Sequence, residues 1–409
     1  MDLHSGLPYW IIKNPLYDYY NPLKKDCVVD VAIIGAGITG ALVAHELCSA
    51  GLKCCIVDKR SIATGSSAAS TALLQYEIDV PLCRLIDKVG EQAAVTAYKA
   101  CLQSISDLER VFKETNVRPD FERVPSVYFA SDAEGQSTIE KEYETRKKYD
   151  LPVEYLNNRE VFRNCRFEAS GALLNHESAQ IDTYKAVIGL LKYHIREDNL
   201  QVYTHTDIKR WQMEGNGCEM MTDKGYIIES DYVVIAAGFE AGPFLPEKVM
   251  KLTSTYALVS HPVDYRFLWP HRSLIWETSD PYLYIRTTEG NRIMIGGEDE
   301  NFSDPNQRDA LLREKTRTLE KKFLQLFPHF YLTTEMAWCG TFGKTEDGLP
   351  YIGTWPRKKR MYFALGYGGN GITYSMIAAQ LIRNSLKQVP DERASVFGFE
   401  RKIKVAEAV

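Results

Sequence analysis

The sequence lacks any excess of positive charge. Its 409 residues contain 49 Lys and Arg against 54 Asp and Glu, which gives a formal net charge of −5. Nucleic acids and anionic membranes attract proteins through clustered basic residues, so we expect neither as a partner. With 45% hydrophobic and 25% charged residues, the chain has instead the composition of a globular protein large enough for two domains.

The sequence also lacks a cysteine pattern typical of disulfides or zinc sites. Its nine cysteines include no C-x-x-C pair, and Cys54 and Cys55 are adjacent within an apolar run. An odd number with this spacing favours buried free thiols, so we expect no disulfide framework and no metal.

Long hydrophobic runs are missing as well. The apolar stretches 31–50 and 361–382 are broken by glycines and polar residues, and neither is suited to crossing a bilayer. Residues 1–15 lack the charged start and the apolar run of a secretory signal. We therefore expect no transmembrane segment and a cytoplasmic location.

What the sequence does have is a strand–helix–strand unit near its start. Residues 28–34 are almost continuously apolar, as in a strand buried on both faces, and residues 38–50 follow at helical spacing until Gly51. Residues 52–57 form a second apolar run. Two parallel strands need a crossover of this kind, so a βαβ unit is predicted here.

A G-x-G-x-x-G motif lies between the first strand and the helix. Its glycines allow a tight turn and let the backbone approach a pyrophosphate, while the helix N-terminus faces the phosphates. Eighteen residues later, Asp58 can accept hydrogen bonds from ribose hydroxyls, with Lys59 next to it. The pattern predicts a Rossmann-type dinucleotide site but does not separate FAD from NAD. The motif residues are Gly35, Ala36, Gly37, Ile38, Thr39 and Gly40.

Further along the chain, helical and strand patterns alternate. Amphipathic helices are predicted at 89–113, 134–149 and 305–326. Short alternating segments between 202 and 228 predict an antiparallel meander. A second, mainly antiparallel sheet is predicted from aromatic-rich segments at 253–261, 274–277, 282–287 and 292–296.

Three later segments extend the nucleotide-binding pattern. A buried strand at 232–236 ends in Ala237-Gly238, and a glycine-rich turn at 365–373 leads into an apolar helix. Together with the T-E-D-G-L-P segment at 345–350, they resemble the D-amino-acid oxidase superfamily of FAD enzymes, which includes glycine, sarcosine and γ-glutamylputrescine oxidases and glycerol-3-phosphate dehydrogenase. The resemblance runs from about Tyr9 to about Ser385.

The resemblance implies an α/β fold with two domains. One is a Rossmann-type FAD-binding domain of the glutathione-reductase-like, D-amino-acid-oxidase type, and the other is an α+β substrate domain with a mainly antiparallel sheet. The FAD-binding domain would be discontinuous and would take residues 27–85, 151–240 and 338–395. The substrate domain would take residues 86–150 and 241–337.

The resemblance also implies FAD as the cofactor. Ile208 would offer its backbone to the adenine, and the serine-rich segment at 65–71 would pass the pyrophosphate and flavin. Thr373 would lie near a flavin carbonyl oxygen at the helix N-terminus, which stabilises the charge of a reduced flavin. The family's flavin-linked cysteine falls at Gly340, one residue from Cys339, which favours a non-covalent flavin. The other implied contacts are Gly65, Ser66, Ser67, Thr71, Ala237, Gly238, Gly366, Gly368, Gly369, Asn370, Gly371 and Ile372.

The substrate side is predicted on one strand. Tyr282, Tyr284 and Arg286 alternate and so share a face, with Trp276 on a nearby segment. The strand resembles the one beside the flavin in the family, where an Arg can bind a substrate carboxylate through two hydrogen bonds. We therefore expect Arg286 and the tyrosines to orient substrate and Lys344 to compensate charge near the flavin. Packing of the rings and a surface role for Arg286 are the alternatives.

Some positions depart from the family. Sarcosine-oxidase-like members carry a His and an Arg in the serine-rich segment and a Lys past the last glycine turn, where this chain has Ala68, Ala72 and Thr373. Met294 stands where those members have a lysine that assists reaction with oxygen. These departures argue against a sarcosine-like substrate and leave O2 or another carrier as the electron acceptor.

The implied reaction is oxidation of a C–N bond of an amine or amino acid, in which hydride transfer to flavin N5 gives an imine that water hydrolyses to a carbonyl product. One alternative is oxidation of a C–O bond of a 2-hydroxy acid or glycerol 3-phosphate, which needs a general base such as His261 or His271. The others are a non-catalytic flavoprotein and an NAD-dependent dehydrogenase.

Overall fold

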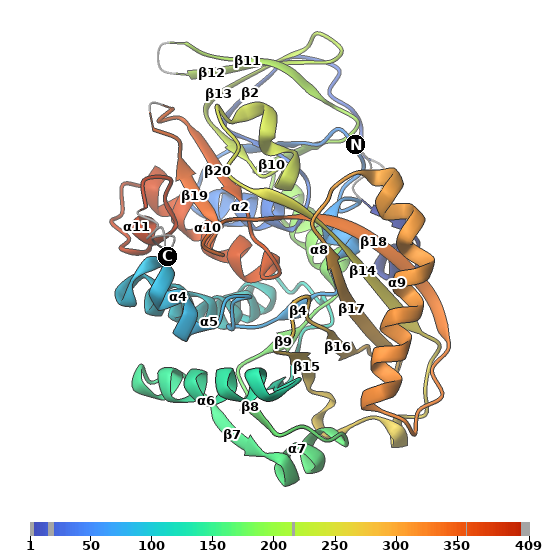
Figure 1. Ribbon diagram of the computed structural model, residues 1–409. Helices are drawn as coiled ribbons and strands as arrows, with labels where there is room; N and C mark the ends of the chain where they lie inside the picture. Colours follow the sequence, from blue (N-terminus) through green and yellow to red (C-terminus); the bar gives the residue numbers. More distant parts are fainter. Residues whose placement is uncertain (1–3, 15–19, 215–216, 357, 402–409) are drawn as a thin grey trace.

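The computed structural model describes residues 4–14, 20–214, 217–356 and 358–401, and two large β-sheets dominate it (Figure 1). One sheet has eight strands and the other has nine. In Figure 1 the eight-stranded sheet occupies the upper part of the view, and the nine-stranded sheet lies below it and to the right. This arrangement of sheets and covering helices confirms the predicted α/β fold.

The eight-stranded sheet has a parallel centre. In spatial order its strands are β10 (Leu200–Tyr203), β3 (Cys54–Val57), β2 (Cys27–Ile34), β13 (Ile227–Ile235), β12 (Gly217–Thr222) and β11 (Ile208–Glu214), with β20 (Met361–Leu365) and β19 (Tyr351–Thr354) paired beyond β13. Neighbours are parallel from β10 to β13 and between β13 and β20, and the remaining pairs are antiparallel. The central strands are apolar on both faces because other elements cover both sides of the sheet.

The predicted βαβ unit is present, with α2 (Ile38–Ser49) connecting β2 to β3. A Cβ on Gly40 would lie 1.9 Å from the carbonyl oxygen of Gly35, so helix and turn approach closely only because glycine has no side chain. Residues along almost the whole of α2 are buried. The cause is packing from two sides, by α8 (Thr183–Arg196) and α10 (Gly371–Leu386).

The nine-stranded sheet is mainly antiparallel, as predicted. In spatial order it contains β1 (His4–Gly6), β18 (Thr334–Lys344), β14 (Lys251–Ser260), β17 (Ile293–Glu300), β16 (Tyr284–Thr287), β15 (Leu274–Glu277), β6 (Ser126–Phe129), β8 (Gly171–Asn175) and β7 (Glu154–Asn157). Only β15 and β6 run parallel among these neighbours. The helix α9 (Pro305–Leu326) lies along this sheet (Figure 1) and packs on β14, β17 and β18.

A small three-stranded sheet and several helices complete the described structure. The small sheet contains β4 (Leu73–Leu74), β9 (Ala179–Gln180) and β5 (Glu122–Arg123). The other helices are α1 (Tyr9–Lys13), α3 (Ser66–Ala69), α4 (Leu82–Val89), α5 (Glu91–Glu114), α6 (Ala133–Lys148), α7 (Asn158–Cys165), α11 (Arg393–Phe397) and the 3₁₀ helices η1 (Gly238–Phe244), η2 (Tyr265–Phe267) and η3 (Pro270–Arg272).

The predicted domain ranges stay a prediction. Strands β7 and β8 fall within the range 151–240 but pair in the nine-stranded sheet, as does β18, which extends into the range 338–395. All nine cysteines are buried and free of disulfide bonds, as expected. Within the described parts of the chain, no helix combines the length and the apolar character that crossing a bilayer requires.

Candidate active site

A cavity of about 650 Å³ is lined by residues of both large sheets. It brings together most of the residues that the sequence predicts at the site, although they are spread over more than three hundred positions. The predicted residues in its wall are Gly35, Gly37, Ile38, Thr39, Asp58, Lys59, Gly65, Ser66, Ser67, Thr71, Ile208, Ala237, Gly238, Tyr282, Tyr284, Gly366, Gly368, Gly369, Asn370, Gly371 and Ile372.

The first glycine-rich turn gives the cavity a wall of backbone. A Cβ on Gly37 would lie 3.0 Å from Ser67 Oγ, and one on Gly35 would lie 2.4 Å from the carbonyl oxygen of Ala236. The helix α2 begins at Ile38, whose backbone N–H donates to Ser67 Oγ at 2.9 Å. Side chains at the glycine positions would fill this wall, so the turn fits a group that needs close backbone contact, such as a pyrophosphate.

Asp58 continues this wall directly after β3. Its Oδ2 accepts a hydrogen bond from the backbone N–H of Ala36 at 2.8 Å, and its Oδ1 accepts one from that of Arg60 at 2.8 Å. Burial raises the pKa of Asp58, although the two backbone donors oppose the rise. Lys59 and Arg60 both pair with Glu240, at 2.8 and 2.6 Å. Two backbone donors thus fix the carboxylate in the cavity wall.

The last glycine-rich turn forms a second stretch of backbone wall at the start of α10. Gly366 has a φ of +78°, in the region that favours glycine. The backbone N–H of Gly369 donates to Asp79 Oδ2 at 2.8 Å, and Asn370 Nδ2 donates to the carbonyl oxygen of Glu77 at 2.7 Å. The turn is therefore tied to the chain segment that follows β4.

Three of the predicted cofactor residues lie outside the cavity wall. The backbone N–H of Ala36 donates to Asp58, and Gly40 allows the helix to approach the turn at Gly35 closely. Thr373 is buried, and its Oγ1 donates to the carbonyl oxygen of Asn370 at 3.0 Å within the first turn of α10. Because the helix turns this side chain into the core, the geometry does not support a contact between Thr373 and a flavin carbonyl oxygen.

Aromatic rings form an apolar part of the wall. Tyr282 and Tyr284 both line the cavity, as their alternation predicts. The Tyr282 ring lies 5.7 Å from the Tyr284 ring and 6.1 Å from that of Trp276, which also lines the cavity. Trp276 stacks on Tyr128 at 3.8 Å, and this contact fixes the plane of the indole.

Arg286 does not line the cavity, so its position does not support the prediction that it binds a substrate carboxylate. The side chain is buried, and Nη1 donates to the carbonyl oxygens of Thr71, Ala72 and Ile181 at 2.9, 2.9 and 3.1 Å. The guanidinium also lies 5.4 Å from the Trp10 ring. Burial lowers the pKa of Arg286 to about 10, so the group stays charged at neutral pH. These hydrogen bonds hold the serine-rich segment against β16.

Lys344 lies beside the cavity wall. Its Nζ is 3.0 Å from Oδ2 of Asp299, which lines the cavity. Burial lowers the pKa of Lys344, but the carboxylates of Asp299 and Asp79 outweigh burial and raise it. The lysine is therefore a cation whose charge is largely balanced by Asp299.

The acidic part of the cavity was not predicted. Gln75, Glu77 and Asp79 line the cavity, whereas Tyr76 and Ile78 between them are buried in the core. Alternation of polar and apolar residues is typical of an extended segment with one face toward the core and the other toward a cavity or solvent. This signal is present in the sequence at 75–79 and could have identified the segment.

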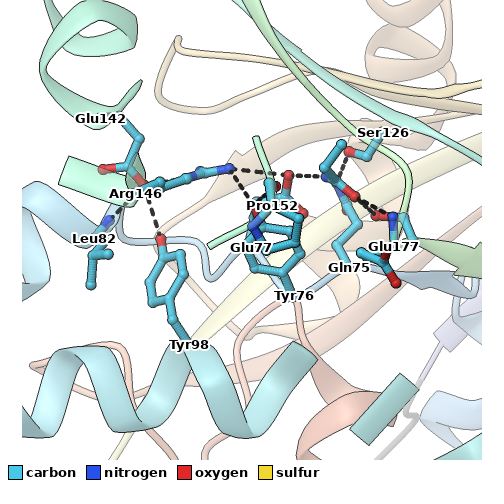
Figure 2. Close-up of polar contacts among 12 residues, drawn as sticks. Gln75, Tyr76, Glu77, Leu82, Tyr98, Ser126, Glu142, Arg146, Pro152 and Glu177 are labelled. Carbon is cyan, nitrogen blue, oxygen red and sulfur yellow. Dashed lines mark hydrogen bonds and ion pairs between the residues drawn. The ribbon is translucent and has the colours of Figure 1, made fainter. Parts of the chain in front are cut away.

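Glu77 belongs to a buried polar network (Figure 2). Its Oε1 accepts hydrogen bonds from Asn175 Nδ2 and, at 3.2 Å, from Arg146 Nη1, while Arg146 Nε lies 2.8 Å from Glu142 Oε1. Burial raises the pKa of Glu77, and Arg146 opposes the rise. Among the described residues, Glu77 Oε2 has no hydrogen-bond partner. Two buried carboxylates thus share one guanidinium next to the cavity.

No histidine lines the cavity among the described residues. His261, one of the two candidate bases, is mostly exposed and lies 3.8 Å from Glu335. Cys339 faces α9, where its Sγ is 3.4 Å from Asp309 Oδ1, and it does not line the cavity as Gly340 does. The thiol of Cys339 therefore points away from the cavity and is not positioned for a covalent link to flavin.

Comparison with known proteins identifies the family. The FAD-dependent oxidoreductase (DAO) family matches residues 30–384. The chain belongs to this family. This FAD-dependent oxidoreductase is 23% identical to glycine oxidase of Geobacillus kaustophilus over 88% of the chain and 93% of that protein. It is also 23% identical to γ-glutamylputrescine oxidoreductase of Escherichia coli, over 91% of the chain and 86% of that protein.

Solved structures show the same fold. Glycine oxidase from Geobacillus kaustophilus matches this oxidoreductase with a TM-score of 0.76 at 20% identity, covering 92% of this chain and 100% of that chain. L-proline dehydrogenase from P. horikoshii matches with a TM-score of 0.75 at 19% identity, and the match covers 90% of this chain and 96% of that chain. The predicted family and the predicted Rossmann-type fold are both confirmed.

Family membership makes FAD the cofactor, as predicted, and the cavity fits it. The wall exposes backbone at Gly35 and Gly37, where an added Cβ would crowd Ala236 or Ser67, and it continues past Asp58 to the N-terminus of α10. In the described ranges, no group of three or more His, Cys, Asp or Glu side chains is arranged to hold a metal ion.

Proposed function

We propose that this FAD-dependent oxidoreductase oxidises a C–N bond of an amine or amino acid and releases an imine, which water converts to a carbonyl product. The observation that carries the proposal is the continuity of one cavity from the glycine-built wall to the aromatic rings of Trp276, Tyr282 and Tyr284. Two relatives in sequence, glycine oxidase and γ-glutamylputrescine oxidoreductase, bear names of enzymes that act on amino or amine groups.

FAD would be held without a covalent bond by residues of the cavity wall. Asp58 would bind the ribose, and the turn at Gly35 and Gly37 with the N-terminus of α2 would bind the pyrophosphate. Ser66 and Ser67 would add hydroxyl donors, and the N-terminus of α10 would face the flavin. When bound, FAD supplies the hydride acceptor for the reaction.

The chain's own residues would prepare the substrate. The aromatic wall would exclude water and press the reacting C–H against the cofactor. An amine must be unprotonated before its neighbouring carbon gives up a hydride, so a proton acceptor near the nitrogen is useful. Asp79 is suited to this role, because burial raises its pKa and Tyr282 O–H donates to its Oδ1 at 3.0 Å.

Oxidation of a C–O bond is the second candidate. It needs a base strong enough to take a hydroxyl proton, for which a histidine is usual. The described cavity wall contains no histidine, so this candidate has less support. A flavoprotein without catalytic activity would keep the nucleotide wall but has no use for the aromatic and acidic side chains beyond it.

An anaerobic screen tests the proposal. Purified holoenzyme is mixed with amines, amino acids and 2-hydroxy acids, and loss of the oxidised flavin absorbance is followed. We expect amines or amino acids to bleach the flavin and hydroxy acids to leave it oxidised. Bleaching by hydroxy acids alone would favour C–O oxidation, and no bleaching by any compound would favour a non-catalytic flavoprotein. Repeating productive reactions with O2 and with a quinone or dye identifies the kind of electron acceptor.

A further inference from the structure

Positive charge is confined to one part of the cavity. Among the described residues that line it, the Lys and Arg side chains are Lys59 and Arg60, directly after β3, and Lys209 on β11. Each is already paired with a carboxylate, because Lys59 and Arg60 contact Glu240 and Lys209 lies 2.6 Å from Asp207. All three belong to the region of the eight-stranded sheet, where the nucleotide is expected.

The other part of the cavity carries carboxylates. Glu77, Asp79 and Asp299 line it. Lys344 balances Asp299, and Arg146 reaches Glu77 but is shared with a second buried carboxylate. Three acidic side chains therefore face one lysine and part of one guanidinium, so acidic groups outnumber basic groups in this part of the cavity.

One of these carboxylates has an unused acceptor. Glu77 is only 3% exposed, lines the cavity, and has no partner for Oε2 among the described residues. A buried polar atom without a partner costs free energy until a donor reaches it. Asp79 also has capacity left, because each of its oxygens accepts one hydrogen bond, from Tyr282 O–H and from Gly369 N–H, and a carboxylate oxygen can accept two.

Aromatic rings border the same carboxylates. Tyr282 is hydrogen-bonded to Asp79, and the rings of Tyr284 and Trp276 lie next to it. The face of an aromatic ring attracts cations, and cages of such rings bind alkylammonium groups. Carboxylates and aromatic faces together favour a ligand with an ammonium head and an apolar stem.

A substrate carboxylate finds no matching partner. Arg286, which the sequence places on this strand, lies outside the cavity, and three backbone carbonyls take its Nη1 donor. Lys344 is held by Asp299. A carboxylate entering this part of the cavity would meet three acidic side chains, which disfavour a ligand of like charge.

We propose that the substrate of this enzyme is a positively charged amine that carries no carboxylate group, bound through Asp79, Asp299 and Glu77. The inference rests on the proposed C–N oxidation and names its substrate class. If the substrate is such an amine, the amino acids on which several relatives act are poor substrates of this enzyme.

Matched pairs that differ only by a carboxylate test the inference. The pairs are 1,4-diaminobutane with ornithine, and propylamine with 2-aminobutanoate, each followed by anaerobic bleaching of the holoenzyme. We expect the carboxylate-free member of each reactive pair to have a kcat/KM at least about a hundredfold higher. Preference for the amino acids would overturn this inference but leave C–N oxidation standing. Bleaching by hydroxy acids alone, or by nothing, would reject both.

A binding measurement tests the same charge preference with ligands that the enzyme cannot oxidise. Butyltrimethylammonium and hexanoate have similar apolar stems and opposite charges, and neither can form an imine. Their binding to the holoenzyme is read from perturbation of the flavin spectrum. We expect a dissociation constant at least tenfold lower for the cation, and equal or tighter binding of hexanoate would contradict the inference.

Variants locate the charge. Asp79→Asn and Asp299→Asn should each raise KM for the best amine about tenfold, with the flavin spectrum kept. Asp87→Asn, an exposed position on α4, is the matched control and should stay within about twofold. If one variant loses FAD, the other still tests the charge. Unchanged KM in the variants that keep FAD would show that these carboxylates do not bind the amine.

Discussion

The two parts of the cavity are built from different material. Where FAD is expected, the wall consists of backbone at Gly35, Gly37 and their neighbours, and a Cβ added at Gly35 would collide with the carbonyl group of Ala236. The other part consists of side chains, including Glu77, Asp79 and Tyr282, which are supported by ion pairs and ring contacts. A backbone wall recognises a shape that all family members share, whereas a side-chain wall can change its ligand with a few substitutions.

The largest effect is expected where the side-chain wall depends on buried charge. Arg146→Met removes the guanidinium that pairs with both Glu77 and Glu142 in the described structure, so two buried carboxylates lose this counter-ion. Breaking a buried ion pair from one side costs about 3–5 kcal/mol of unfolding free energy, measured by urea denaturation. Arg84→Met, at a half-exposed arginine on α4, is the control and should cost about 0.5 kcal/mol or less. A loss below about 1 kcal/mol for Arg146→Met would show that the network is not needed for stability.

The next effect concerns the backbone wall alone. Gly37→Val places a branched side chain where a Cβ already meets Ser67 Oγ at 3.0 Å. We expect FAD affinity to fall at least about a hundredfold, which corresponds to about 2.7 kcal/mol, measured by titrating apoprotein with FAD. The control is Gly290→Ala, in an exposed turn, which should bind FAD normally. Normal FAD binding by Gly37→Val would contradict a backbone-built nucleotide site.

Arg286 separates a structural role from a substrate role. Arg286→Met leaves the carbonyl oxygens of Thr71, Ala72 and Ile181 without their shared donor, so we expect about 2 kcal/mol of lost stability. The ratio of kcat/KM between matched amines and amino acids should not change. A selective loss of activity toward carboxylate-bearing compounds would place Arg286 at the substrate after all. Arg163→Met, at an exposed position on α7, controls for loss of a positive charge.

The smallest effect tests one hydrogen bond of the side-chain wall. Tyr282→Phe removes the donor to Asp79 Oδ1 while keeping the ring. We expect KM for the best amine to change about fivefold, or about 1 kcal/mol, with FAD affinity unchanged. Tyr265→Phe, at a 70% exposed tyrosine, serves as the control. A fall in FAD affinity would show that the two parts of the cavity are less independent than proposed.

The same contrast explains what the sequence could predict. Backbone turns demand glycine at fixed spacing, so the motif around Gly35 identifies the nucleotide wall from short segments alone. The acidic wall joins Asp79 to Asp299, two hundred and twenty residues apart, through a sheet whose strand order the sequence does not state. The alternation at 75–79 shows that the segment has two faces, but it does not show which face meets a ligand.

The position of Arg286 differs from the expectation for a specific physical reason. Tyr282, Tyr284 and Arg286 do alternate, and the first two reach the cavity as expected. Two residues further along, the serine-rich segment crosses the strand and supplies carbonyl oxygens that accept hydrogen bonds from Arg286 Nη1. Strand periodicity predicts the direction of a side chain but not where a neighbouring segment ends the cavity.

Three tryptophans in the cavity wall, Trp211, Trp276 and Trp338, give the protein a built-in optical reporter. Trp211 belongs to the eight-stranded sheet, and the other two belong to the nine-stranded sheet. Indole emission overlaps the absorption of flavins, so bound FAD should quench these residues by energy transfer. The fraction of protein that carries its cofactor can therefore be followed from intrinsic fluorescence, without a label and without turnover.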